Sequence, residues 1–161
     1  MILRKKNDIY TYMEVVEQLE PKRVLDIGML LKRFGCISRN ALNKSVHEDV
    51  ILDGIDVWSQ IQLPVWNSVY DSIFDMNEWS AHTSTEGYDL AVLLGTKEIL
   101  EQISILELFN GVSVKYLLTD QWPMEWKHYW GDVPFRTIKV DEDVYYMVEL
   151  GDKKWIQESM L

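Results

Sequence analysis

Glu125 and His128 are the side chains best placed for acid–base chemistry, since they stand three residues apart in the segment 119–132, TDQWPMEWKHYWGD. Residues at this spacing share one face of a helix. An imidazole exchanges its proton near neutral pH, so His128 is a candidate general base. Both residues are therefore candidate catalytic groups on the side of a bound substrate.

The same segment is rich in tryptophan. Trp122, Trp126 and Trp130 recur every four residues, which predicts that they stack along one side of a helix whose first turn contains Pro123. Aromatic residues at this spacing usually pack against other side chains. The alternative interpretation is therefore a cap over the sheet edge, or a homodimer contact formed through Trp122–Trp130.

Other chemistries lack their residue patterns. His47, His82 and His128 lie far apart, and none has a Cys or His at ligand spacing, so no metal site is expected. The single cysteine, Cys36, has no neighbouring histidine, which favours a small buried side chain over a nucleophile. A nicotinamide-dependent dehydrogenase is not expected, because the loop after Gly28 lacks the other two glycines of GxGxxG.

Helical periodicity and short apolar runs alternate along the chain. The pattern predicts helices over 8–19, 30–43 and 97–109, with Thr96 capping the last, and strands over 23–28, 50–58, 69–74, 88–94, 112–118, 135–140 and 143–150. Such alternation is typical of a mostly parallel sheet with helices on both faces, and the last two strands predict an antiparallel hairpin. One domain over residues 1–161 is expected, because no linker rich in Ser, Gly or Pro divides the chain.

Four positions lie at the carboxyl ends of the predicted parallel strands or within two residues of them: Gly28, Asp56, Asp75 and Gly95. Ligands of such sheets bind beyond the carboxyl ends of the strands, so these positions mark the predicted binding site. The alternative is that the carboxylates here are ordinary strand-end and turn residues, which are common.

The segments around these positions carry a family resemblance in their order and spacing. They are RVLDIGMLLKRFG (23–35), GIDVW (54–58), SIFDMNEW (72–79) and YDLAVLLGTKEIL (88–100). Together they resemble the four strand-end motifs of class I S-adenosylmethionine (SAM)-dependent methyltransferases, of which the first is typically VLDIGCGxGxxG. The resemblance covers residues 8–150. It implies a Rossmann-like three-layer α/β fold with a mostly parallel seven-stranded sheet that ends in an antiparallel hairpin.

Position by position, the resemblance implies a set of cofactor-binding residues. Asp56 matches the acid that binds the ribose hydroxyls of SAM, and Asp75 matches the acid beside the adenine. The other positions carried over are Asp26, Gly28, Gly95 and Glu98. The implied reaction moves a methyl group from SAM to a nitrogen or oxygen of a small molecule or sugar.

The loop after Gly28 departs from the family pattern. Leu30 and Lys32 replace two glycines that let the backbone approach the amino-acid end of the cofactor. Either SAM binds in a shifted pose, or these side chains fill the pocket and SAM no longer binds. In the second case the chain is a non-catalytic interaction or scaffold protein of the same fold.

Charge is unevenly distributed along the chain. The net charge is −10, of which residues 1–44 contribute +4 and residues 45–161 contribute −14. An acidic body disfavours binding to nucleic acid, whose phosphates need Lys and Arg. No apolar run is long enough to span a membrane. One cysteine and the lack of a signal-peptide pattern favour a cytoplasmic location.

Overall fold

The computed structural model describes residues 6–28, 50–57, 70–81, 87–109 and 112–151. Its helices are α1 (Lys6–Leu19), α4 (Met76–Ala81), α5 (Thr96–Leu100), α6 (Ile105–Phe109), the 3₁₀ helix η2 (Pro123–Trp126) and α7 (Lys127–Trp130). Its strands are β1 (Arg23–Ile27), β2 (Ile51–Asp56), β3 (Ser72–Asp75), β4 (Tyr88–Leu93), β5 (Val114–Thr119), β6 (Phe135–Val140) and β7 (Asp143–Glu149). Each predicted strand is present within three residues of its expected ends. The predicted helix 30–43 lies outside the described residues.

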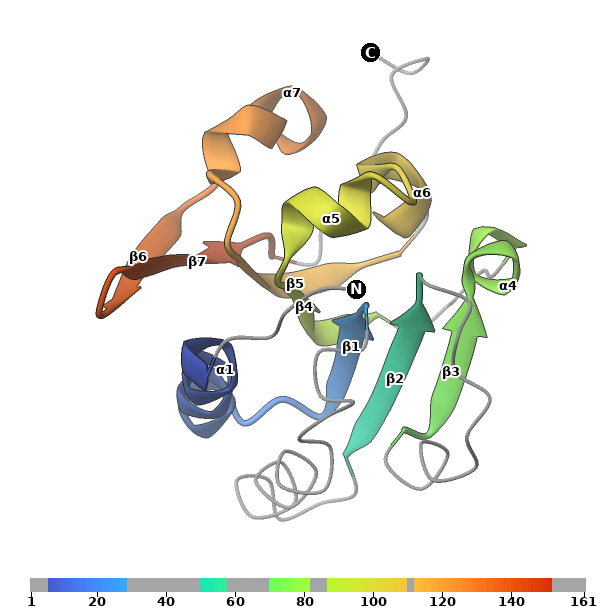
Figure 1. Cartoon of the computed structure of the whole chain (residues 1–161), viewed down its shortest axis with the longest axis horizontal. Helices are drawn as coiled ribbons and strands as arrows, with labels where there is room; N and C mark the ends of the chain where they lie inside the picture. The colour runs from blue at the N-terminus through green and yellow to red at the C-terminus, as the bar shows by residue number, and fades with distance from the viewer. Residues whose placement is uncertain (1–5, 29–49, 58–69, 82–86, 110–111, 152–161) are drawn as a thin grey trace.

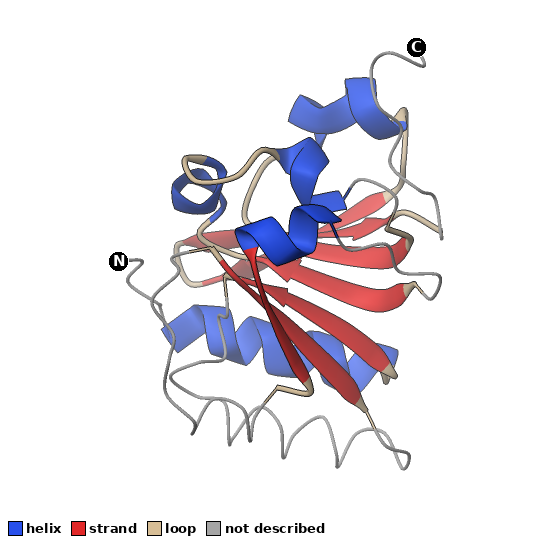
Figure 2. Ribbon diagram, turned by 90° about the vertical axis from the view of Figure 1, so that its right-hand side faces the viewer, coloured by secondary structure: helices blue, strands red, loops and turns tan. Residues whose placement is uncertain are grey.

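These strands form one sheet, which in the described part of the chain has the order β3-β2-β1-β4-β5-β7-β6. The first five are parallel, and β7 runs antiparallel to both β5 and β6. Helix α1 covers one face, and the other described helices lie on the opposite face (Figures 1 and 2). The structure therefore confirms the predicted three-layer α/β fold with its closing hairpin.

A hydrophobic cluster on each face of the sheet holds the layers together. On one face, α1 contributes Ile9, Tyr12, Val15 and Val16. On the other face, α4, α5, α6, η2 and α7 contribute Trp79, Ile99, Ile105, Leu108, Phe109, Trp126 and Trp130. Burial on both faces explains why the central parallel strands β1 and β4 are mostly apolar.

The first helix follows its predicted pattern closely. It begins two residues before the predicted start and ends at Leu19 as predicted. Glu20 then adopts a left-handed conformation, with φ 48°, and Pro21 follows it. A hydrogen bond from the Tyr145 hydroxyl to Asp8 Oδ1, 2.6 Å long, ties this helix to β7.

The predicted continuous helix over 97–109 is wrong, because the chain forms two short helices, α5 and α6, in its place. Ser104 Oγ accepts the Glu107 N–H at 3.2 Å, which is the bond that an N-cap side chain makes when a new helix begins. Thr96 is not the cap of α5 either. That position is taken by Gly95, and Thr96 is the first helical residue.

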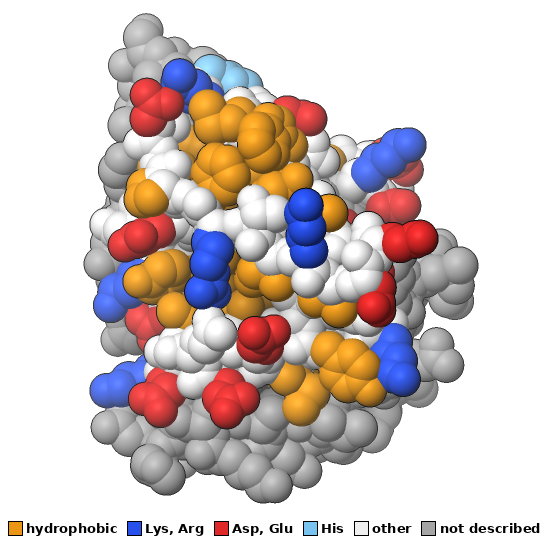
Figure 3. Space-filling view, turned by 90° about the vertical axis from the view of Figure 1, so that its left-hand side faces the viewer, with side chains coloured by type: hydrophobic (Ala, Val, Ile, Leu, Met, Phe, Trp, Pro, Cys, Tyr) orange, Lys and Arg blue, Asp and Glu red, His pale blue; other side chains and the backbone are white. Residues whose placement is uncertain are grey.

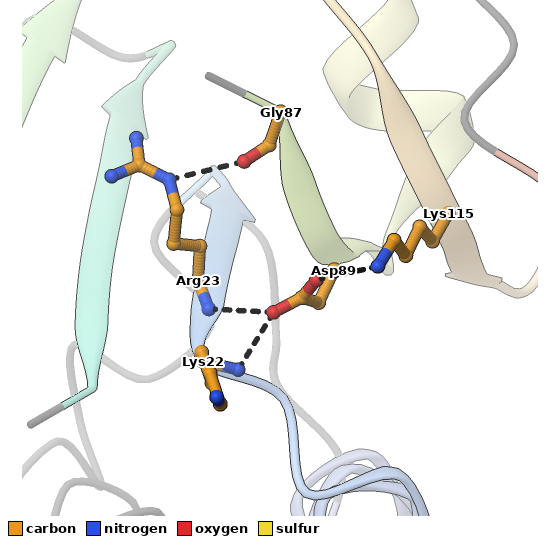
Figure 4. A network of polar contacts seen from close by, with 5 residues as sticks. All are labelled: Lys22, Arg23, Gly87, Asp89 and Lys115. Carbon is orange, nitrogen blue, oxygen red and sulfur yellow. Dashed lines mark hydrogen bonds and ion pairs between the residues drawn. The ribbon is translucent and has the colours of Figure 1, made fainter. Parts of the chain in front are cut away.

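Polar contacts at the amino ends of the strands join β1 to β4 (Figure 4). Asp89 Oδ2 accepts the backbone N–H groups of Lys22 and Arg23, at 2.8 and 3.1 Å, and Asp89 Oδ1 lies 3.6 Å from Lys115 Nζ. Arg23 Nε donates to the Gly87 carbonyl at 3.0 Å. These bonds fix the start of β1 against β4.

Candidate functional site

The carboxyl ends of the five parallel strands meet at one edge of the sheet. The register places Ile27 level with Ile55 and Leu93, and Leu93 level with Thr119. Gly28 and Asp56 directly follow Ile27 and Ile55, Gly95 lies two residues after Leu93, and Asp75 is paired with Asp56. The structure therefore brings Gly28, Asp56, Asp75 and Gly95 to the same edge, as the sequence predicted.

Two carboxylates lie side by side at this edge. Asp56 and Asp75 are directly paired residues at the ends of β2 and β3, and in a sheet such pairs share a face about 4.8 Å apart. Asp56 is 5% exposed, and Asp75 is half-buried. Asp75 Oδ1 also accepts the Glu78 N–H at 2.7 Å in the first turn of α4. Ionised carboxylates only accept hydrogen bonds, so the pair suits a ligand that presents hydroxyl or amine donors.

Gly28 turns the chain immediately after β1. Its φ of 80° lies in the left-handed region that favours glycine, and its N–H donates to the Ile55 carbonyl at 2.9 Å. The next residues, which include Leu30 and Lys32, lie outside the described part of the chain. Their effect on a cofactor remains a prediction.

Asp26 occupies the interior rather than the edge. It is 0% exposed, and the Tyr70 hydroxyl donates to Asp26 Oδ2 at 2.6 Å. The sequence analysis did not single out Tyr70, because nothing in its local pattern pairs it with a residue 44 positions away. The contact gives Asp26 a clear role within the protein, and the role in cofactor binding carried over from the resemblance stays a prediction.

The turn between β4 and α5 is held by Asp120, which the sequence analysis did not assign. Gly95 has φ 73°, and its N–H donates to Asp120 Oδ2 at 3.0 Å. Asp120 Oδ1 accepts from both the N–H and the hydroxyl of Thr96. The Thr96 hydroxyl also contacts Thr119 Oγ1 at 3.2 Å. Asp120 directly follows β5, so its position as a strand-end acid was the signal that could have identified it.

The other predicted residues are exposed. Glu98 lies on the first turn of α5. Glu125 lies on η2 and accepts a hydrogen bond from the Gln121 side-chain amide, whereas His128 lies on α7 with its ring centroid 3.9 Å from that of Tyr129. Among the residues that the structure describes, no hydrogen bond or ion pair joins Glu125 to His128. Their catalytic roles stay predictions.

The three tryptophans do not line one side of a helix, because η2 and α7 are short and Trp122 precedes both. Trp126 and Trp130 are buried and meet edge to face, with centroids 5.6 Å apart. Trp122 is 46% exposed and packs edge-on against Phe135 and Tyr146 of the hairpin. Hydrophobic side chains gather on the side of the molecule where this hairpin lies (Figure 3).

Two absences hold for the described residues. No group of three or more His, Cys, Asp or Glu side chains is arranged there to hold a metal ion. None of the described helices is long and apolar enough to cross a membrane.

Comparison with known proteins identifies the fold. The sequence matches no protein-family model, and no curated protein matches it. The structure is similar to cofactor-bound Rv0187 from MTB, with a TM-score of 0.58 and 10% identity over 94% of this chain and 83% of that chain. A putative O-methyltransferase from Klebsiella pneumoniae gives 0.57 and 11% identity over 91% of this chain and 81% of that chain.

A ribosomal RNA methylase from Escherichia coli is also similar, with a TM-score of 0.53 and 17% identity over 89% of this chain. The chain spans 63% of the length of that methylase. Identities this low show the fold alone. The chain thus has the fold of class I SAM-dependent methyltransferases, as the strand-end motifs indicated.

Proposed function

We propose that this chain is a SAM-dependent methyltransferase whose acceptor is a small molecule or a sugar. The observation that carries the proposal is the pair of neighbouring carboxylates, Asp56 and Asp75, at the binding edge of this fold. The nucleoside part of SAM presents two adjacent ribose hydroxyls and an adenine amine. Acceptor-only carboxylates suit these donors, and the described residues therefore fit the nucleoside half of the cofactor.

Each residue has a distinct part in this proposal. Asp56 accepts hydrogen bonds from the ribose hydroxyls, and Asp75 lies on the adenine side. Gly28 turns the backbone at the end of β1, at the edge where the proposed cofactor site lies. The bound cofactor supplies an electrophilic methyl group, and the protein supplies binding and orientation.

The acceptor side lies beyond β4 and β5. Asp120 accepts hydrogen bonds from the N–H groups of Gly95 and Thr96 there, which ties the end of β5 to the turn after β4. His128 is exposed in the segment that follows β5, so it is the candidate base for removing a proton from an acceptor hydroxyl or amine. The charge of −14 on residues 45–161 favours a small acceptor over RNA, because an acidic surface repels phosphates.

One observation favours the alternative, a non-catalytic protein of the same fold. The Asp120 carboxylate already takes the N–H groups of Gly95 and Thr96 at the binding edge. Together with Leu30 and Lys32 in the cofactor loop, this is compatible with a site that no longer takes a ligand.

Thermal unfolding with and without SAM, or its demethylated product S-adenosylhomocysteine, distinguishes the two functions. Ligand at about 100 times its dissociation constant adds about 2.7 kcal/mol, so the enzyme should gain a few degrees in Tm. An unchanged Tm at millimolar concentrations of both ligands would reject the enzyme. The double variant Leu30→Gly, Lys32→Gly then tests steric blocking, because it should create binding only if those side chains fill the pocket.

A further inference from the structure

A cavity of about 420 Å³ opens away from the proposed methyl-transfer site. It lies between the last turn of α1 and the strands β5, β7 and β6. Asp56 and Asp75 are on β2 and β3, so β1 and β4 separate the two sites. The cavity volume falls in the range of about 300–1,000 Å³ that is usual for small-molecule sites.

The strand register shows why the lining residues converge. Tyr116 of β5 is paired with Glu149 of β7, and Met147 of β7 is paired with Arg136 of β6. Paired residues share a face, and both Tyr116 and Met147 belong to the hydrophobic cluster on the α1 side of the sheet. All four side chains therefore point toward α1. Leu19, from the last turn of α1, completes the apolar part of the lining.

Arg136 brings a positive charge to this cavity. Its Nη2 donates to Gln18 Oε1 at 2.8 Å, so an uncharged amide of α1 orients the guanidinium. No carboxylate of the described residues forms an ion pair with Arg136. In a chain with 26 acidic and 16 basic residues, a basic side chain oriented by a neutral partner retains its capacity for an anionic ligand.

Glu149 brings a negative charge to the same cavity. Its backbone N–H donates to the Pro134 carbonyl at 2.9 Å, which holds this residue beside the start of β6. Its carboxylate forms no ion pair with a described residue. A simple anion is disfavoured by Glu149, and a simple cation is disfavoured by Arg136. The occupant that satisfies both carries one charge of each sign on a small apolar body.

We infer that this cavity binds a free α-amino acid with an apolar side chain. The carboxylate of the ligand pairs with Arg136, whose planar guanidinium matches it with two parallel hydrogen bonds. The ammonium group pairs with Glu149. The side chain of the ligand packs against Leu19, Tyr116 and Met147. This site is independent of the cofactor, so its occupation does not compete with SAM.

Calorimetric titration of the full chain with L-phenylalanine tests this inference. Two analogues are the matched probes: 3-phenylpropionate lacks the ammonium group, and phenethylamine lacks the carboxylate. L-Phenylalanine should bind, and each analogue should bind at least about tenfold more weakly, since each leaves one charged residue unpaired. The NMR signal of the Met147 methyl group should shift on addition of L-phenylalanine, and it should shift less at the same concentration of either analogue. Repeating the titration with SAM present should leave the affinity unchanged, whether or not SAM itself binds.

Two variants locate the interaction. Arg136→Gln should weaken L-phenylalanine binding at least about tenfold. Lys139→Gln is the matched control, because Lys139 is an exposed base on the same strand and does not line the cavity. The affinity of this variant for L-phenylalanine should stay within about twofold of that of the natural chain. No binding of L-phenylalanine at about 10 mM, equal binding of phenethylamine, or equal losses in both variants would each overturn the inference. The analogue series on the natural chain decides alone if Arg136→Gln does not fold.

Discussion

The two edges of the parallel sheet use aspartate in different ways. At the amino edge, Asp89 receives two backbone N–H groups from the residues that begin β1 and lies near Lys115 (Figure 4). At the carboxyl edge, Asp56 and Asp75 lie side by side as the last residues of β2 and β3. The residue type is the same, and the neighbouring groups differ.

This difference separates residues that stabilise the sheet from residues that we propose bind a ligand. A carboxylate that accepts backbone N–H groups from another strand contributes to the stability of the sheet. Two carboxylates at adjacent strand ends concentrate acceptors in one place, which suits a ligand that presents hydroxyl or amine donors. Substitutions at the carboxyl edge should therefore alter SAM affinity, and substitutions at the amino edge should alter the free energy of unfolding.

The largest effect is expected from Asp56→Asn. The amide replaces one charged acceptor by a donor, so one ribose hydroxyl loses its partner and SAM affinity should fall about 100-fold. The dissociation constant of SAM, measured by calorimetry, checks this. Asp132→Asn is the control for charge alone, because Asp132 is exposed and, among the described residues, forms its ion pair with Lys127. Equal losses in the two variants would mean that bulk charge, and not a hydrogen bond, governs binding.

Asp89→Ala should act on stability instead. The N–H groups of Lys22 and Arg23 lose a charged acceptor, so the free energy of unfolding should fall by about 2 kcal/mol. Urea unfolding measures the change. Asp132→Ala should change it by less than about 0.5 kcal/mol, because both side chains of that ion pair are largely exposed. A SAM affinity that falls with Asp89→Ala in the folded protein would break the distinction between the two edges.

The smallest effect is an alkaline loss of stability. Burial, followed by the hydrogen bond to Asp53, raises the pKa of Tyr88 above its usual range. The unfolded chain releases this proton near pH 10 and the folded chain retains it, so stability is full below about pH 10 and falls above it. The free energy of unfolding should drop by up to about 1.4 kcal/mol per pH unit for this tyrosine.

Urea unfolding between about pH 8 and pH 11 measures that slope. Tyr88→Phe should be less stable at neutral pH, because Asp53 loses its hydroxyl donor, and its stability should decline less steeply with pH. The same slope in both proteins would assign the alkaline loss to other groups. Tyr145 would then be the first residue to test, because burial, followed by its hydrogen bond to Asp8, raises its pKa in the same direction.

Local patterns predicted most of the scaffold. The apolar run of β4 and the glycine after β1 are readable without tertiary information, because burial on both faces demands continuous apolar residues and a left-handed turn favours glycine. The prediction of one helix over 97–109 was wrong, because the Ser104 side chain caps a new helix there. A serine inside an otherwise helical pattern can either continue the helix or cap a new one. Which of the two forms depends on how the two segments pack.

Contacts between distant residues could not be predicted. Tyr70 with Asp26, Tyr88 with Asp53 and Tyr145 with Asp8 each join residues that are 35 or more positions apart. The cavity near Arg136 also depends on such contacts, since it needs α1 beside the hairpin. A single sequence shows that these residues are polar, but it does not show which tyrosine will bond to which aspartate.

The sequence by itself determined the order of strands and helices, and the placement of Asp56, Asp75 and Gly95 at strand ends, because periodicity and chain direction are local properties. Only the tertiary structure decided which of the strand-end residues are bonded within the protein. It assigned Asp120 to the turn at Gly95 and Asp26 to Tyr70, and it placed Asp56 beside Asp75, which accepts the Glu78 N–H. The physical reason is that hydrogen bonds select among acceptors by distance in space, which folding alone establishes.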